Sequence, residues 1–179
     1  MSINIKKILS LFCCALLSFL FVLPTNITFA SSSNELDVLL NTILEYSTVY
    51  EDGRFIFNEE TAKANGESEE IIEIGKKVEE LSMGYYQLKM GIEPYNGLPF
   101  YGNWCGPKHT GHGDPIDYLD KQCKIHDECY ADNGYFNCDC DKELVEAIDR
   151  KYDDMSGSQK EMAAAIRLYF KGQMFAHGC

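Results

Sequence analysis

The apolar positions of this chain form one unbroken run near its start and several periodic segments after it. Residues 8–23 are almost continuously apolar and follow Lys6 and Lys7, and Thr-Phe-Ala at 28–30 then offers small residues at the positions that a signal peptidase needs. A positive, an apolar and a small-residue segment in this order are typical of a secretory signal peptide. We therefore assign residues 1–30 to a signal peptide and expect the remainder to be exported. An uncleaved membrane anchor is the alternative, because the apolar run nearly reaches the length of a spanning helix.

Two segments beyond the signal region carry apolar residues at helical spacing. In residues 34–50 they fall at positions 36, 39, 40, 43 and 44, and Asn34 is a plausible N-cap. In residues 68–89 isoleucine, valine and leucine can form one stripe, with Ser68 as the cap. The residues between these two segments contain glycine and asparagine, which favour turns. We expect two helices joined by a turn over 51–66.

The second half of the chain predicts a loop followed by three helices. Residues 91–115 are rich in glycine, proline and aromatic residues, as in an irregular segment. Asp114 could cap a helix that has Pro115 in its first turn. Helical spacing then predicts helices over 115–132, 139–155 and 159–175. The fold class is therefore mainly α.

Charge narrows the range of partners. The chain carries 16 basic and 28 acidic residues, a formal net charge of −12. Loss of the signal peptide removes Lys6 and Lys7 but no acid, which leaves 14 basic residues and a net charge of −14. Such an acidic chain is not expected to bind nucleic acid or anionic lipid. A neutral lipid surface, or a requirement for cations, suits it better.

The cysteines divide the exported part in two. Cys13 and Cys14 lie in the apolar run, and the other six fall between Cys105 and Cys179. An even number of cysteines in an exported domain favours disulfides over metal thiolates. We expect residues 31–95 to be a helical N-terminal extension and 96–179 to be the functional domain. The extension could be a propeptide, a lid or a partner-binding helical pair.

The residues that point most specifically to a chemical activity lie in the segment DKQCKIHDECY, residues 120–130. On a helix, Cys123, His126, Asp127 and Tyr130 follow the i, i+3, i+4, i+7 spacing and share one stripe. A histidine can act as a general base on water near neutral pH, provided that an acceptor holds its other ring nitrogen. Asp141, in CDCDKE, is a candidate for that acceptor.

The glycine-rich loop YGNWCGPKHTGHGDP, residues 101–115, precedes this helix. Glycines allow the backbone to curl so that several carbonyl oxygens point inward, and Ca²⁺ accepts such oxygens. A carboxylate is needed to complete the shell, and Asp127 can supply it. The chemical alternative is a zinc site drawn from six ligands at short spacing, namely Cys105, His109, His112, Cys123, His126 and Cys129.

The combination of WCG, DxxCxxHDxCY and CxCD resembles the secreted phospholipase A2 family over residues 101–142. The resemblance implies a fold with two antiparallel, disulfide-linked helices and a calcium-binding loop. It also implies Ca²⁺-dependent hydrolysis of the sn-2 ester of glycerophospholipids at a membrane or micelle surface. An inactive binding or toxin module with the same fold is the alternative.

The resemblance implies three acid–base roles by position: His126 activates water, Asp141 orients His126, and Tyr130 hydrogen-bonds Asp141. It also implies that Asp127 binds Ca²⁺ together with the carbonyl groups of Trp104, Gly106 and Lys108. The Gly106 N–H is implied to stabilise the oxyanion. The resemblance implies the cysteine pairs Cys105–Cys123, Cys129–Cys140 and Cys138–Cys179. Lys108 stands where the family commonly has glycine, so the third carbonyl could instead come from His109, Thr110 or Gly111. His126 and Phe136 are only ten positions apart, which points to a compact microbial form without the β-wing of the animal enzymes.

Overall fold

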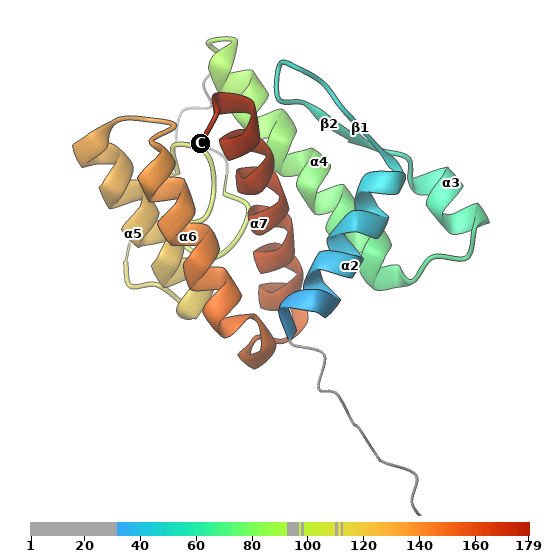
Figure 1. The fold of residues 1–179 in the computed structure, drawn as a ribbon. Helices are drawn as coiled ribbons and strands as arrows, with labels where there is room; N and C mark the ends of the chain where they lie inside the picture. The colour runs from blue at the N-terminus through green and yellow to red at the C-terminus, as the bar shows by residue number, and fades with distance from the viewer. Residues whose placement is uncertain (1–31, 93–96, 98, 110, 112) are drawn as a thin grey trace, which may run out of the picture. The chain divides into compact units, whose positions relative to one another are not determined.

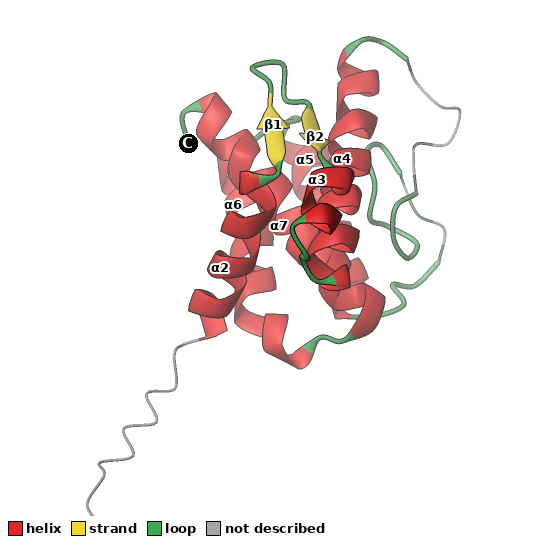
Figure 2. Ribbon diagram, turned by 90° about the vertical axis from the view of Figure 1, so that its right-hand side faces the viewer, coloured by secondary structure: helices red, strands yellow, loops and turns green. Residues whose placement is uncertain are grey.

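The computed structural model describes residues 32–92, 97, 99–109, 111 and 113–179. The signal segment expected at 1–30 and the domain boundary expected at 95/96 lie outside the described residues. The described part is mainly helical, as expected, with the elements α2 (Ser32–Glu45), β1 (Ser47–Val49), β2 (Phe55–Phe57), α3 (Glu59–Ala64), α4 (Glu69–Lys89), α5 (Tyr118–Asn133), α6 (Cys138–Lys151), the short 3-10 helix η1 (Tyr152–Asp154) and α7 (Gly157–His177) (Figures 1 and 2). None of the described helices is long and apolar enough to cross a membrane.

Helix α7 lies at the centre of the described unit, with α4 on one side and α6 on the other (Figure 1). Ala163, Ala164 and Ala165 on α7 are completely buried. Their small side chains let neighbouring backbones come close, and larger residues such as Ile74 of α4 and Ile148 of α6 fill the space around them. One hydrophobic core therefore spans both halves of the sequence.

Helix α4 confirms the prediction for residues 68–89 almost to the residue. The side chain of Ser68 accepts a hydrogen bond from the Ile71 N–H and so caps the helix. Near the other end, the Tyr85 ring stacks on Tyr169 of α7 with centroids 4.7 Å apart. The described part of the N-terminal extension is thus packed into the same core as the functional half.

The region between the first two helices differs from the prediction. The helix expected over 34–50 ends at Glu45. The expected turn over 51–66 contains strand β2, which pairs with β1 as an antiparallel hairpin, and the short helix α3. Alternation explains the hairpin, because Phe55 and Phe57 face the core while Ile56 points outward. Ser82 of α4 accepts a hydrogen bond from the Phe55 N–H at 3.0 Å. The hairpin depends on this packing against α4, which a reading of local sequence does not include.

The start of helix α5 also differs. The helix begins at Tyr118 with Asp117 as its N-cap, three residues after the start expected from Asp114 and Pro115. Disulfides then join Cys105 to Cys123, Cys129 to Cys140, and Cys138 to Cys179. These are the same pairs that the family resemblance implies. The second bridge joins α5 to α6, and the first joins the glycine-rich loop to α5.

Candidate active site

Helices α5 and α6 bring His126 and Asp141 together. The His126 Nε2 atom lies 2.9 Å from Asp141 Oδ1, and the Tyr130 hydroxyl donates to the same oxygen. All three side chains are buried. Asp141 stands in the first turn of α6, where the helix dipole favours a negative charge. The structure thus places these three residues in the contacts that the resemblance implies.

This geometry determines which nitrogen of His126 can act as a base. Because Nε2 faces a carboxylate, that nitrogen carries the proton and Nδ1 keeps its lone pair. Burial and the hydrogen bond to Asp141 raise the pKa of Tyr130 far above its ordinary value, so its hydroxyl remains a donor. The Phe170 ring meets the imidazole edge-on with centroids 4.8 Å apart. The His126 imidazole therefore has contacts on two sides that restrict its rotation.

Asp127 lies beside His126, and both line a small cavity of about 20 Å³. That volume holds about one water molecule. The buried Oδ2 atom of Asp127 has no hydrogen-bond partner among the described residues. The pKa of Asp127 is raised to about 8, mainly by burial and to a smaller extent by the nearby carboxylates of Glu128 and Asp120. A buried carboxylate oxygen without a donor is a position where a cation would be stabilised.

The loop supplies the other wall of this cavity. Trp104 and Gly106 line it, whereas Lys108 is not among its lining residues. Lys108 nevertheless has a φ of +51°, in the left-handed region that favours glycine. The backbone thus adopts a glycine-like conformation where the resemblance expects glycine. Thr110, another candidate for the third carbonyl, lies outside the described residues. The backbone N–H of His109 donates to the Gly106 carbonyl at 3.1 Å, so that carbonyl already accepts one hydrogen bond within the loop.

Gly111 is the remaining candidate for the third carbonyl, and its backbone is held against a different part of the loop. A Cβ at Gly111 would lie only 1.8 Å from the Asn103 carbonyl oxygen. The Trp104 side chain also has defined contacts, since its Nε1–H donates to the Gly113 carbonyl at 3.1 Å and Lys124 lies 4.6 Å above its ring. These contacts fix the path of the loop across the start of α5.

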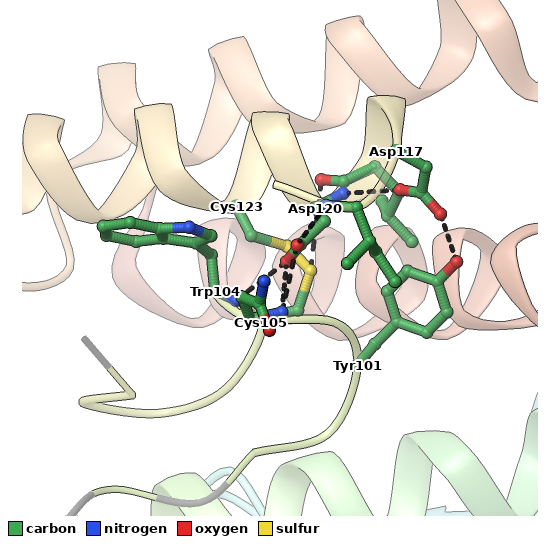
Figure 3. Close-up of a disulfide and its surroundings, with 9 residues drawn as sticks. Tyr101, Trp104, Cys105, Asp117, Asp120 and Cys123 are labelled. Atoms are coloured by element: carbon green, nitrogen blue, oxygen red, sulfur yellow. Dashed lines mark hydrogen bonds between the residues drawn. A yellow bond between two sulfur atoms is a disulfide. The ribbon is translucent and has the colours of Figure 1, made fainter. Parts of the chain in front are cut away.

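Asp120 holds the loop in place, a role that the sequence motifs do not indicate. Its buried carboxylate accepts hydrogen bonds from the backbone N–H groups of Asn103, Trp104 and Ile116 (Figure 3). A Cβ on Gly102 would lie 2.4 Å from this carboxyl group, so glycine is needed there for close approach. Asp120 opens the DxxCxxHDxCY motif, but its burial follows from the loop folding over α5.

The residues present fit Ca²⁺ better than zinc. All the cysteines of the zinc alternative form disulfides, which removes their thiolates as ligands. Within the described ranges, no group of three or more His, Cys, Asp or Glu side chains could hold a metal. A metal beside His126 would therefore bind Asp127 together with backbone oxygens, and Ca²⁺ prefers such oxygen ligands.

Comparison with known proteins shows what the chain is similar to. No family model matches the chain, and no solved structure matches it. The chain is 62% identical over 34 residues to the acidic phospholipase A2 homolog taipoxin gamma chain of Oxyuranus scutellatus scutellatus, a match that covers 19% of this chain and 21% of that protein. It is 42% identical over 52 residues to phospholipase A2-beta of Arabidopsis thaliana, covering 28% of this chain and 35% of the relative. It is 41% identical over 69 residues to phospholipase A2 AP-PLA2-I of Acanthaster planci, covering 38% of each. The chain thus spans less than two fifths of the length of each of these relatives.

Proposed function

Because this chain is related to the secreted phospholipase A2 family, we propose that it hydrolyses the sn-2 ester of glycerophospholipids and releases a fatty acid and a lysophospholipid. The contact between His126 and Asp141, with the buried Asp127 carboxylate alongside, is the observation that carries the proposal. The cofactor is Ca²⁺. The reaction is outside the cell, where the three disulfides are stable.

His126 and Asp141 carry the proton transfers. The Nδ1 atom of His126 removes a proton from the attacking water, and Asp141 stabilises the imidazolium that results. His126 then returns the proton to the leaving alkoxide, so the histidine is regenerated and no covalent intermediate with the chain is needed. Tyr130 donates to Asp141 throughout, which keeps that carboxylate aligned with Nε2.

Asp127 and the loop provide the electrostatic part of the site. Asp127 would hold Ca²⁺ together with the carbonyl oxygens of Trp104 and Gly106, and the third loop carbonyl is expected from Lys108 or its neighbours. When bound, the ion acts as a Lewis acid that polarises the ester carbonyl and neutralises the adjacent phosphate. The Gly106 N–H donates to the oxyanion that develops during attack.

The net charge favours a neutral lipid surface as the partner. With 28 acidic and 16 basic residues, the chain is repelled by anionic lipid and by nucleic acid. Phosphatidylcholine, whose headgroup has no net charge, is therefore the substrate of choice for a first assay.

The test is fatty-acid release from phosphatidylcholine micelles, measured with Ca²⁺ and with a chelator. We expect release only with Ca²⁺, and a loss of at least a thousandfold in His126→Gln. His177→Gln makes the same change at an exposed histidine of α7 and should keep full activity. Unchanged release by His126→Gln would refute the mechanism. Absence of release by the wild type, with retained binding to micelles, would favour the inactive binding module.

A further inference from the structure

The cavity beside His126 is too small for a phospholipid acyl chain. Its volume of about 20 Å³ holds about one water molecule, whereas sites for organic ligands usually have volumes of about 300–1,000 Å³. An acyl chain whose ester lies next to His126 needs more room than this. Hydrolysis at this site therefore requires that part of the cavity wall moves.

Most of the wall is fixed by its contacts. A disulfide ties the loop to α5, and the indole N–H of Trp104 is hydrogen-bonded within the loop. The Phe170 ring contacts the His126 ring, so its displacement would also release the histidine. Three further wall residues are almost fully buried in the core, namely Leu81, Leu144 and Ile166. These parts of the wall cannot move without disrupting the loop, the core or the base itself.

Tyr85 of α4 is the exception. It is only partly buried, and its hydroxyl has no hydrogen-bond partner among the described residues. The ring is held by aromatic contacts, stacked on Tyr169 at 4.7 Å and edge-on to Phe170 at 5.9 Å between centroids. Tyr130, by contrast, is anchored through its hydroxyl to Asp141. Rotation of the Tyr85 side chain thus costs aromatic packing but breaks no hydrogen bond.

A space into which this ring can turn lies on its other side. Tyr85 also lines a hollow of about 80 Å³, which we call the rear hollow. The rear hollow is bounded by α4, α7, the β1–β2 turn and the α5–α6 turn, and its wall includes Tyr86, Phe136 and Gln173. Among the described residues, Tyr85 alone lines both the rear hollow and the cavity beside His126. Its side chain is therefore the partition between them, at a place where α4 lies alongside α7 (Figure 1).

We propose that the Tyr85 ring is a gate that the sn-2 acyl chain must open, so that this residue determines which chain lengths are cleaved. In the open state the ring turns into the rear hollow, and the acyl chain takes its place against Phe170 and Leu81. A chain long enough to reach the gate displaces the ring, and a shorter chain does not. The inference rests on the proposed hydrolysis and names a residue that sets its specificity. The cost of opening lowers the apparent affinity for longer chains.

Hydrolysis of monomeric phosphatidylcholines with butanoyl or octanoyl chains tests the gate. In Tyr85→Leu, kcat/KM for the octanoyl substrate should rise about fivefold relative to the butanoyl substrate, since a stacked aromatic pair is worth about two- to tenfold in an equilibrium constant. Tyr85→Phe keeps the ring and should retain the wild-type ratio. Tyr86→Leu changes the neighbouring tyrosine, which lines the rear hollow but not the cavity beside His126, and should also retain it. An unchanged ratio in folded Tyr85→Leu would overturn the gate.

A second measurement uses the wild-type protein and needs no hydrolysis, so it decides the question even if Tyr85→Leu does not fold. The probe is a non-hydrolysable phosphatidylcholine analogue with two ether-linked octyl chains, added with Ca²⁺ below its micelle concentration. Nuclear Overhauser contacts between the Tyr85 and Tyr169 rings should be lost when it binds, and should remain with the dibutyl analogue. Contacts that persist with the octyl analogue bound, or absence of saturable binding of that analogue, would refute the gate.

The two measurements separate the gate from the reaction. Hydrolysis by the wild type, with an unchanged chain-length ratio in Tyr85→Leu and intact ring contacts, would refute the gate and leave the proposed hydrolysis standing. Loss of the ring contacts on binding of the octyl analogue, without hydrolysis by the wild type, would support the gate and refute the proposed hydrolysis.

Discussion

The backbone N–H of Trp104 donates to Asp120 Oδ1 at 2.8 Å, which ties the glycine-rich loop to the first turn of α5. Two more backbone N–H groups donate to the same carboxylate. In Asp120→Asn, the side-chain amide would present an NH₂ group to these donors. We expect a loss of about 3 kcal/mol in the free energy of unfolding, because buried donors lose a charged acceptor. Urea unfolding measures it, and Asp132→Asn on the exposed face of the same helix should cost less than about 0.5 kcal/mol.

The left-handed backbone at Lys108 gives a second prediction. At a φ of +51° a lysine is strained, so Lys108→Gly should stabilise the fold by up to about 1 kcal/mol. Lys108→Ala removes the same charge but keeps the Cβ, and should bring no such gain. Thermal unfolding compares the two variants, and equal stabilities would show that the charge, and not the backbone, determines the effect.

The raised pKa of Asp127 predicts how the stability of the metal-free protein depends on pH. The folded-state pKa of about 8 lies above the ordinary 3.8, so the folded protein holds this proton more tightly than the unfolded chain does. The resulting stabilisation is complete below about pH 4 and is lost as the pH rises through about 8. Asp127→Asn cannot titrate, so its stability relative to the wild type should increase over this range.

Urea unfolding in chelator, from pH 5 to pH 9, measures that difference. Addition of Ca²⁺ should reduce it at high pH, because the wild-type carboxylate then has a cation and the asparagine has none. A wild-type and an Asp127→Asn curve that remain parallel in chelator would contradict the raised pKa.

Removal of the Cys129–Cys140 and of the Cys138–Cys179 disulfide should affect stability and activity in different proportions. Chain-entropy arguments predict a loss of about 3 kcal/mol without the Cys129–Cys140 bridge and of about 4 kcal/mol without Cys138–Cys179, since these close loops with sequence separations of 11 and 41. The shorter bridge also holds α5 against α6, where His126 meets Asp141. Its double serine variant should therefore lose at least tenfold more hydrolysis rate than the other double variant. The reverse order of rates would show that the helix pair keeps its register without this bridge.

The parts of the fold that could be predicted are those with signals in consecutive residues. The cap at Ser68 and the apolar stripe after it are local, and helix α4 follows them. The family motifs likewise place His126, Asp127 and Asp141 on facing helices, because each motif lies within a short run of consecutive residues. The hairpin could not be predicted in the same way, since Phe55 and Phe57 form a strand only when α4 covers them.

Asp120 and Asp117 show the same limit within the site. Both are acids near the start of a helix, and local rules allow several nearby acids to act as the cap. Asp117 caps α5 while Asp120 turns toward the loop, and the difference arises because residues 102–104 fold back over the helix. Only the three-dimensional path of the loop distinguishes the two acids.

The distribution of the three disulfides also shapes the denatured chain. All of them lie between Cys105 and Cys179, so an oxidised chain that unfolds remains cross-linked there while residues 32–104 become a free polymer. The free part has the greater conformational entropy to lose on refolding. On refolding, the segment of helix α4 must pack back onto α7. Until it does, the face of α7 that α4 covers in the folded protein is exposed to water. Aggregation during refolding should therefore begin on the uncovered face of α7.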